Sequence, residues 1–289
     1  MSKPSTTKVP LNSKFISVAG HRLHYFDEGK GDTILIVHGI PEWSMIYADL
    51  VKELSATHRC IIPDHLGFGF SNKDRNADLS PRAHSARLLE FIKNLGLKNI
   101  HLVVHDYGGP IGIGALVQQP ELFASLSISN TWLWNLQQTK EGRTLKMMQG
   151  MLGKWLYLHY GFSVKFMARN GFADKTVFNS AKDLFMRVHR TPEERYANYQ
   201  LMLEMYNSGP WFDEIQDKLK QTAIPGEITW GMKDKFFTPG NHLARWREEF
   251  PSYAVKELPA SGHFPQVEAS KEMAGHIRNF ANRNALAGV

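Results

Sequence analysis

The sequence predicts an α/β fold in which a mostly parallel, doubly wound sheet is interrupted by a helical insertion. Short continuous apolar runs of strand length alternate with helical patterns, as in parallel sheets that helices cover on both faces. Several of these runs end in glycine-containing turns that also carry His or Asp. A long central segment, in contrast, shows helical periodicity and no strand-like alternation. Together these observations predict one α/β core with a helical cap inserted into it.

The core begins with a predicted hairpin, because residues 15–26 alternate apolar and polar side chains around Ala19-Gly20. Ser80 and Pro81 predict the start of a helix, since Ser is a favoured cap and Pro a favoured first helical residue. In chain order, the other predicted elements are strands at 34–37 and 60–62, the helix from Ser80 to Gly96, a strand at 100–104, a helix ending at Gln119-Pro120, strands at 126–129, 226–230 and 254–258, and a final helix at about 270–282. Strand and helix therefore alternate as a parallel sheet requires.

The central segment divides the chain into three parts. Residues 1–130 are predicted to form the first part of the core, 131–220 the helical cap and 221–289 the second part of the core. The cap segment is rich in Trp, Tyr, Phe and Met, most of which we expect to pack its helices together. The others are expected to line a pocket between cap and sheet, because ligands of open α/β sheets bind beyond the carboxyl ends of the strands.

Composition narrows the class of protein. The 289 residues carry a formal charge of +6, but Lys and Arg are scattered among acids, so neither nucleic acid nor membrane is expected as a partner. Residues 1–7 have no apolar core, and no apolar run approaches the roughly 18 residues of a spanning helix, which predicts a cytoplasmic protein. Cys60, the single cysteine, is expected to be a buried hydrophobe. The histidines show no zinc-binding spacing, so no metal is expected.

The most informative motif is His105-Asp106-Tyr107-Gly108, which lies between a predicted strand and a glycine-rich helix. This is the layout of a nucleophile elbow, a strand–turn–helix that usually presents a serine at the tip of the turn. A carboxylate is ionised at neutral pH and needs no base before it attacks carbon. Asp106 would form an alkyl ester that water must then hydrolyse, so the site requires a histidine and an acid that orients it.

Two further residues meet that requirement. Asp234 follows a predicted strand, and His263 lies in the loop after the last one. The chain order nucleophile, acid, histidine is that of the α/β hydrolases. We therefore expect Asp106 to be the nucleophile, His263 the base that activates water, and Asp234 the acid that orients His263. The backbone N–H groups of Tyr107 and Ile40 are expected to stabilise the oxyanion.

Five motifs in this order resemble those of the haloalkane dehalogenases. They are His38-Gly39-Ile40-Pro41-Glu42-Trp43-Ser44, Pro63-Asp64-His65-Leu66-Gly67-Phe68-Gly69, Val104-His105-Asp106-Tyr107-Gly108-Gly109, Gly231-Met232-Lys233-Asp234-Lys235 and Ser261-Gly262-His263-Phe264-Pro265. The resemblance covers nearly the whole chain outside the cap. It implies an α/β-hydrolase fold with a cap, cleavage of a carbon–halogen bond by water, no cofactor, a small apolar electrophilic substrate, and a monomer or homodimer. It also implies the branch with its acid at Asp234, because the stretch Asn130-Thr131-Trp132 holds no carboxylate.

The chain departs from these relatives where they bind the halide. Their nucleophile is followed by Trp, whose indole N–H holds the departing ion, whereas this chain has Tyr107. Their second donor is a cap Trp or an Asn in the turn position that Ile40 occupies here. Residues that could replace these donors or line the pocket are Asn170, Trp132, Trp134 and Trp155.

Three other functions fit parts of the pattern. Epoxide hydrolases share the Asp nucleophile and use two cap tyrosines as acids, for which this cap offers Tyr157, Tyr160, Tyr196, Tyr199 and Tyr206. Asp-nucleophile relatives that act on β-lactones or fluoroacetate are a second alternative. A binding protein without catalysis is the third, although such proteins usually lose part of the triad. A serine esterase is disfavoured because no Ser occupies the elbow.

Overall fold

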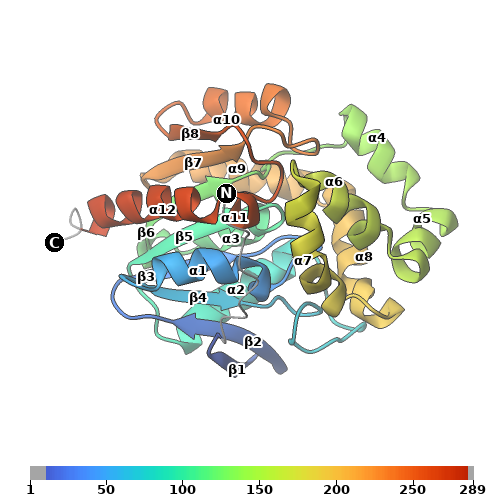
Figure 1. Cartoon of the computed structure of the whole chain (residues 1–289), viewed down its shortest axis with the longest axis horizontal. Helices are drawn as coiled ribbons and strands as arrows, with labels where there is room; N and C mark the ends of the chain where they lie inside the picture. Colours follow the sequence, from blue (N-terminus) through green and yellow to red (C-terminus); the bar gives the residue numbers. More distant parts are fainter. Residues whose placement is uncertain (1–10, 286–289) are drawn as a thin grey trace.

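The computed structural model describes residues 11–285 and contains an eight-stranded sheet with helices on both faces (Figure 1). The strands are β1 (Ser13–Val18), β2 (His21–Glu28), β3 (Thr33–Val37), β4 (Arg59–Pro63), β5 (Ile100–His105), β6 (Phe123–Ser129), β7 (Gly226–Gly231) and β8 (Ala254–Leu258). Their order across the sheet is β1-β2-β4-β3-β5-β6-β7-β8. Strand β2 pairs antiparallel with β1 and β4, and the other neighbours are parallel. The predicted α/β fold with a mostly parallel sheet is confirmed.

The helices predicted from Ser80 to Gly96, after the elbow and at about 270–282 are present as α2, α3 and α12, whereas α1, α10 and α11 were not predicted. The α-helices are α1 (Ala48–Leu54), α2 (Pro81–Asn94), α3 (Gly108–Leu116), α4 (Lys140–Met147), α5 (Met151–Trp155), α6 (Arg169–Gly171), α7 (Lys175–Arg187), α8 (Pro192–Asn207), α9 (Gly209–Gln221), α10 (Ala244–Glu249), α11 (Pro265–Glu268) and α12 (Ser270–Ala285). Short 3₁₀ turns are η1 (Ser44–Tyr47) and η2 (Pro120–Leu122), and π-helical turns are η3 (Leu156–Tyr160), η4 (Ser163–Ala168) and η5 (Pro239–Leu243). Ser80 caps α2 as predicted, because its hydroxyl accepts from the Ala83 N–H at 3.2 Å.

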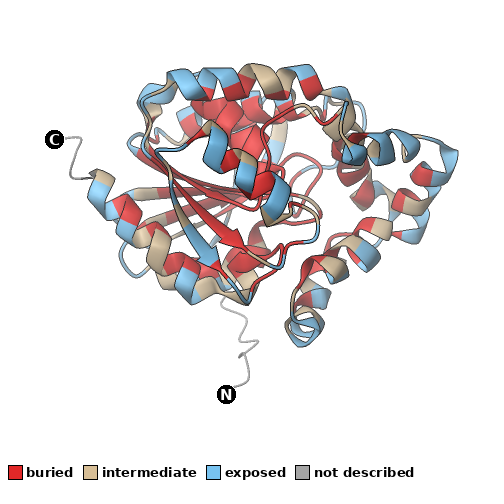
Figure 2. Ribbon diagram, turned by 90° about the horizontal axis from the view of Figure 1, so that it is seen from above, coloured by how far each residue is buried: buried red, intermediate tan, exposed pale blue. Residues whose placement is uncertain are grey.

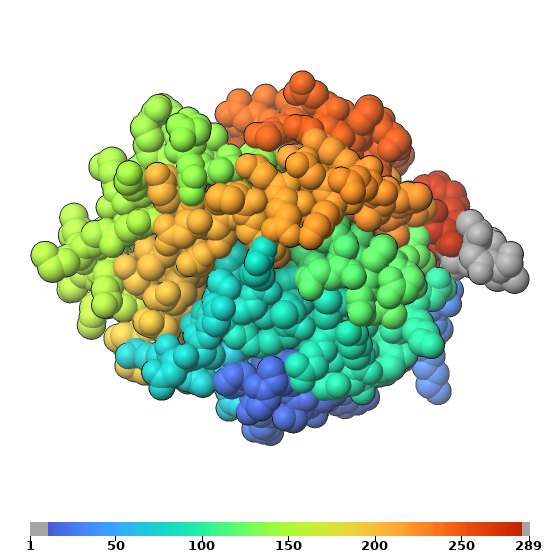
Figure 3. Space-filling view, turned by 180° about the vertical axis from the view of Figure 1, so that it is seen from behind, coloured from blue at the N-terminus to red at the C-terminus, as the bar shows by residue number. Residues whose placement is uncertain are grey.

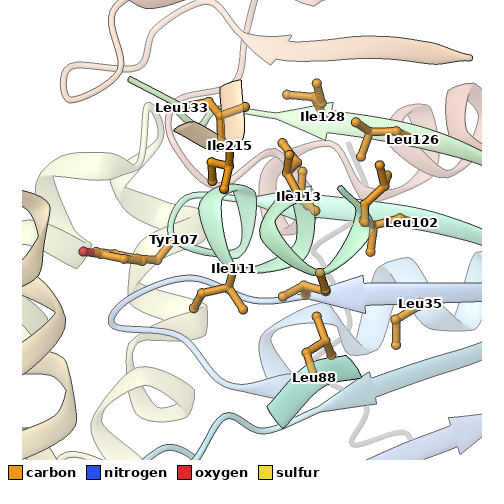
Figure 4. Close-up of a cluster of buried hydrophobic side chains, with 14 of the residues drawn as sticks. Leu35, Leu88, Leu102, Tyr107, Ile111, Ile113, Leu126, Ile128, Leu133 and Ile215 are labelled. Carbon is orange, nitrogen blue, oxygen red and sulfur yellow. The ribbon is translucent and has the colours of Figure 1, made fainter. Parts of the chain in front are cut away.

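The two faces of the sheet are both buried, as continuous apolar strands require. Leu35 and Val37 of β3 pack into a cluster with α2, α3 and α9, while Ile34 and Ile36 point to the opposite face and pack with α1 and α12. Figure 2 shows this buried interior between outer helices, along which buried and exposed residues alternate. Figure 4 shows part of the first cluster around α3. Burying each such side chain stabilises the fold by about 1.5–3 kcal/mol relative to leaving it exposed.

Cys60 lies in β4 and is fully buried. Burial raises the pKa of its thiol to about 12, so it stays protonated and serves as the small hydrophobe that the sequence predicts. Residues 1–7, in which the sequence shows no apolar core, lie outside the described residues. Within the described range, no helix combines the length and apolar character needed to cross a membrane.

The segment between β6 and β7 is helical, and its described residues include no strand. Helices α4 to α8 and the turns η3 and η4 project to one side of the sheet (Figure 1). The last helix of this segment, α9, packs against α3 of the core, and its Phe212, Ile215 and Leu219 join the same hydrophobic cluster as Ile111 of α3. It therefore covers the sheet, as the position of Ile215 in Figure 4 illustrates. The boundaries of the cap at 131 and 220 stay predictions.

Candidate active site

Asp106 stands at the tip of a tight turn between β5 and α3, with a φ of 48° in the left-handed region that side chains other than glycine rarely adopt. Hydrogen bonds from both sides hold this backbone. The Asp106 N–H donates to the Asn130 carbonyl at 3.2 Å, and the Thr131 hydroxyl donates to the Asp106 carbonyl at 2.5 Å. A Cβ on Gly108 would lie 2.0 Å from the Val37 carbonyl oxygen, so glycine is required there. The sequence-predicted elbow is therefore present.

The structure brings the three predicted catalytic residues together from three different loops. His263 Nδ1 lies 2.8 Å from Asp234 Oδ2, and His263 Nε2 lies 3.5 Å from Asp106 Oδ2. All three side chains are buried. Asp234 Oδ1 accepts from two further backbone N–H groups, those of Phe236 at 2.8 Å and Phe237 at 3.2 Å. The carboxylate is thus held by the chain itself, which leaves Oδ2 aimed at the imidazole.

The electrostatics of His263 depend on both acids. Burial by itself would lower the pKa of this imidazole, but the Asp234 carboxylate and a hydrogen bond to Asp106 raise it to about 10. In turn, burial would raise the pKa of Asp234, and His263 lowers it. The two neighbouring acids therefore favour the protonated form of His263 at neutral pH.

The loop after β3 supplies the predicted oxyanion donor. The Ile40 N–H donates to Asp106 Oδ1 at 2.7 Å, so one carboxylate oxygen occupies this donor while the other faces His263. A Cβ on Gly39 would meet Asp106 Oδ1 at 2.3 Å, which explains why glycine precedes Ile40. Tyr107 stands at the N-terminal end of α3, where backbone N–H groups lack an acceptor one turn earlier.

A buried glutamate beneath this loop was missed by sequence reasoning, although it follows directly in the His-Gly-Ile-Pro-Glu motif. Glu42 Oε2 accepts from the Gly39 N–H at 3.0 Å and the Tyr47 hydroxyl at 2.6 Å. Its Oε1 accepts from Gln266 at 2.6 Å and lies 3.2 Å from His105 Nε2. Burial would raise the pKa of Glu42, but His105 lowers it. The charged Glu42 fastens the loop that carries Ile40 to the strand that carries Asp106.

Asn130 is a second residue whose role the sequence did not indicate. Its amide nitrogen donates to Asp234 Oδ2 at 2.8 Å, and its amide oxygen accepts from the Gly231 N–H at 2.9 Å. Asn130 follows β6, the position at which the other branch of the haloalkane dehalogenases carries its acid. Here the residue orients the acid of the neighbouring strand.

A cavity of about 340 Å³ opens above Asp106 and His263, with one wall from the core and one from the cap. Its lining is mainly apolar. The core contributes Ile40, Pro41, Phe236, Phe237 and Phe264, and the cap segment contributes Leu136, Leu145, Tyr157, Met167, Met202 and Met205. Such a cavity suits a small apolar molecule, as the sequence predicts.

Tyr157 is the one cap tyrosine among the five considered that lines this cavity within the described residues. Burial raises the pKa of its phenol, and the negative charge of Asp106 raises it further. The phenol therefore stays neutral and can donate a hydrogen bond, and Tyr157 borders the same cavity as the predicted nucleophile. Tyr199 packs behind it, with ring centroids 5.9 Å apart.

The residues predicted to bind the leaving group or line the pocket lie elsewhere. Among the described residues that border the cavity, neither the Tyr107 side chain nor Trp132, Trp134, Trp155 or Asn170 is found. Tyr107 is fully buried, and its ring centroid lies 4.9 Å from that of Trp132 with the two rings nearly perpendicular. Figure 4 shows its phenol pointing away from the packed side chains of the sheet. Trp155 is 53% exposed, and Asn170 donates to the Phe166 carbonyl at 2.7 Å.

These positions have a physical reason. Trp132 and Trp134 lie three and five residues after the end of β6, and both pack into the hydrophobic cluster above the sheet. Trp155 lies on the outer side of α5 and stacks on Tyr160. Aromatic composition alone did not show which side of a cap helix faces inward. Within residues 11–285, no group of three or more His, Cys, Asp or Glu side chains is arranged to hold a metal ion.

Comparison with known proteins agrees with this architecture. The α/β hydrolase fold family matches residues 32–270. A cis-3-alkyl-4-alkyloxetan-2-one decarboxylase of Shewanella oneidensis is 31% identical over 294 residues, covering 95% of this chain and 89% of that protein. Haloalkane dehalogenase 2 of Mycobacterium tuberculosis is 27% identical over 276 residues, covering 95% and 96%. The chain therefore belongs to the α/β hydrolase fold family.

Solved structures support the same fold. The haloalkane dehalogenase DbeA of Bradyrhizobium elkani matches with a TM-score of 0.83 at 19% identity, over 94% of this chain and 99% of that one. A putative ancestral haloalkane dehalogenase matches with a TM-score of 0.82 at 20% identity, over 92% and 99%. The chain is thus an α/β hydrolase with haloalkane dehalogenases among its relatives, as the motifs predicted.

Proposed function

We propose that this α/β hydrolase forms a covalent alkyl ester on Asp106 with a small apolar electrophile. The observation that carries the proposal is the arrangement of Asp106, His263 and Asp234 at the base of an apolar cavity. Asp106 Oδ1 accepts from the Ile40 N–H, so Oδ2 is the oxygen free to attack. In the haloalkane version, Oδ2 forms a bond to carbon while the carbon–halogen bond breaks and the halide leaves with its electron pair.

The charge of Asp106 then controls the base. Esterification neutralises this carboxylate and removes two of the influences that raise the pKa of His263, its charge and its hydrogen bond. His263 loses its proton more readily once the ester exists, and the neutral imidazole takes a proton from water. The hydroxide attacks the carbonyl carbon of the ester, and the Ile40 N–H stabilises the oxyanion on Oδ1. The bond from that carbon to Oδ2 then breaks, so that the alcohol leaves with Oδ2 and a proton from His263, and the oxygen of water stays on Asp106.

The leaving group separates two versions of this chemistry. Haloalkane dehalogenation is the first, because the chain has haloalkane dehalogenases among its relatives. Its halide would need a donor other than Trp, because the described cavity lining includes none. We favour the phenol of Tyr157, beside the polar side chains of Ser163 and Asn198. An epoxide hydrolase would find one of its two tyrosine acids here, again Tyr157.

A second candidate is the opening of a β-lactone, favoured by the 31% identity to a protein named as an oxetanone decarboxylase. Asp106 Oδ2 would attack the tetrahedral ring carbon that is bonded to the ring oxygen. The bond between that carbon and the ring oxygen would break, which leaves a carboxylate on the adjacent carbon. Loss of carbon dioxide then forms the carbon–carbon double bond as Asp106 departs with its electron pair. The leaving oxygen stays attached to the substrate, so no halide donor is needed, and no water is consumed.

The test uses His263→Gln and Asp106→Asn with two substrates, a bromoalkane and a dialkyl β-lactone. For dehalogenation, His263→Gln should accumulate an adduct of alkyl mass and release one bromide per protein. For lactone decarboxylation, the same variant should continue to release alkene, because that route requires no activated water. Asp106→Asn should abolish both. Undiminished turnover by Asp106→Asn, with either substrate, would reject the ester mechanism.

A further inference from the structure

The outer surface of the cap carries most of the exposed large apolar side chains of the described chain. Eight such side chains are exposed, and six of them lie between residues 147 and 166. These six define what we call the outer cap surface: Met147 at 81% exposed, Met151 at 91%, Leu152 at 71%, Trp155 at 53%, Tyr160 at 48% and Phe166 at 51%. Figure 3 shows this segment in yellow-green along one edge of the molecule. Figure 1 places α5 at the right-hand end of the molecule, and Figure 2 shows that this end is largely exposed.

The charge on this surface has one sign. From residue 142 to residue 173 the sequence contains no Asp or Glu. The same stretch contains five cations, all of them exposed: Arg143, Lys146, Lys154, Lys165 and Arg169. Lys165 lies over the ring of Tyr160, 4.5 Å from its centroid. The scattered charge of the whole chain therefore conceals one acid-free region in which cations alternate with exposed apolar groups.

We propose that the outer cap surface binds the surface of an anionic lipid bilayer. Apolar side chains that project singly beside cations are the pattern of segments that lie in the membrane interface, where the apolar groups enter the acyl boundary and the cations meet the headgroups. Lys and Arg gain from the negative potential of anionic lipid within a Debye length of that surface. The proposal replaces the expectation, drawn from overall charge, that no membrane is a partner.

Two other occupants fit less well. A second copy docked face to face would place each set of cations against its own equivalent, with no acid in the stretch to pair with them. A folded acidic protein would have to receive Met147 and Met151, which project with more than four-fifths of their surface exposed and lie outside the hollow that Tyr160, Phe166 and Lys165 help to line. Deformable acyl chains accept such side chains without a matching pocket.

The same segment also forms a wall of the active-site cavity. Leu145 of α4, Tyr157 of η3 and Met167 of η4 line the cavity, while Met147, Tyr160 and Phe166 of the same three elements are exposed on the outer side. The surface that meets lipid and the wall that contacts substrate are thus two sides of the same helices. An apolar substrate dissolved in the bilayer would be delivered next to the cavity. The binding itself is independent of the chemistry proposed for Asp106.

The experiment is flotation of the whole chain with vesicles of phosphatidylcholine alone or mixed with phosphatidylglycerol. We expect binding to the anionic vesicles, weakened by salt, and little binding to the neutral ones. The triple variant Met151→Ser, Leu152→Ser, Trp155→Ser should bind at least about tenfold more weakly, because large apolar side chains are removed. The reversal variant Lys154→Glu, Lys165→Glu should lose binding to a similar degree.

Matched controls are Phe15→Ser, an exposed apolar residue on β1, and Lys93→Glu with Lys98→Glu, exposed cations beside α2. These should bind as the unchanged chain does, and circular dichroism should show that every variant is folded. Absence of vesicle binding at low salt, or binding retained by both cap variants, would overturn the proposal. So would a dimer that only the cap variants break, which would assign the surface to self-association. Binding to polyglutamate that the triple variant retains unchanged would assign the outer cap surface to an acidic polypeptide.

Discussion

The two walls of the cavity are built on different principles. On the core side, each functional group is held by several hydrogen bonds: Asp234 has four partners, and Asp106 is fixed through its backbone and its Oδ1. On the cap side, half of the lining is Leu and Met, and the rest is Tyr157 with the polar side chains of Glu141, Thr144, Ser163 and Asn198. We therefore expect the core to set the type of reaction and the cap to select the molecule that undergoes it.

The largest effect is expected on the core side, when the proposed nucleophile is removed. Asp106→Asn preserves the shape of the side chain and the contact with the Ile40 N–H but eliminates the attacking oxygen. We expect turnover to fall by on the order of 10⁶-fold, as when the nucleophile of another hydrolytic triad is removed. The measurement is single-turnover kinetics with the substrates named above, and the melting temperature serves as the control for folding.

The same substitution should change the acidity of His263. Its pKa is raised to about 10, partly by the charge of Asp106, so Asp106→Asn should move it toward the ordinary value of 6.5. Because folding raises this pKa, the group stabilises the fold fully below pH 6.5 and loses that contribution as pH rises to about 10. In Asp106→Asn the loss should occur over a narrower and lower range. Imidazole NMR titration measures the first effect and unfolding against pH the second; an unchanged titration would show that Asp106 does not control the base.

On the cap side, Tyr157→Phe probes whether a single donor serves the leaving group. We expect kcat to fall by about 10²-fold, the usual cost of one preorganised donor. Stability should be nearly unchanged, because the described structure contains no hydrogen bond from this hydroxyl to the protein. Tyr199→Phe is the matched control, since Tyr199 packs against Tyr157 without lining the cavity. Equal losses in both variants would point to packing in place of donation.

Asn130→Ala tests the support behind the core wall. The change removes hydrogen bonds to Asp234 and to the Gly231 N–H, which we expect to cost about 1–3 kcal/mol in stability and about tenfold in kcat. Asn130→Asp replaces the donor with a second carboxylate beside Asp234 and should be worse for catalysis at neutral pH. Denaturant unfolding and steady-state kinetics measure the two effects. A fully active Asn130→Ala would show that backbone N–H groups alone hold Asp234.

Asn130 also shows where sequence reasoning reached its limit. The strands, the elbow and the convergence of Asp106, Asp234 and His263 followed from apolar runs, glycines and the rule that strand ends meet at one edge. Asn130 was passed over because a hydrogen bond between neighbouring strands leaves no local pattern. The predictions of which aromatic residues line the cavity were wrong for a related reason. Its aromatics show helical spacing, but which side of a short helix faces inward depends on packing that is remote in sequence.

The smallest effect is expected for the exposed Trp155, in contrast to the buried Trp132. Trp155→Ala should change stability by less than about 0.5 kcal/mol and kcat by less than about twofold, because the side chain is 53% exposed on the outer cap surface. Trp132→Ala should cost about 3–5 kcal/mol, since its ring is fully buried between Tyr107, Phe212 and Phe237. Both residues were predicted to serve the pocket, and neither borders it. If Trp155→Ala instead slowed turnover in solution without vesicles, the outer cap surface would act on the cavity directly, and the division between a reactive core and a selecting cap would have to be redrawn.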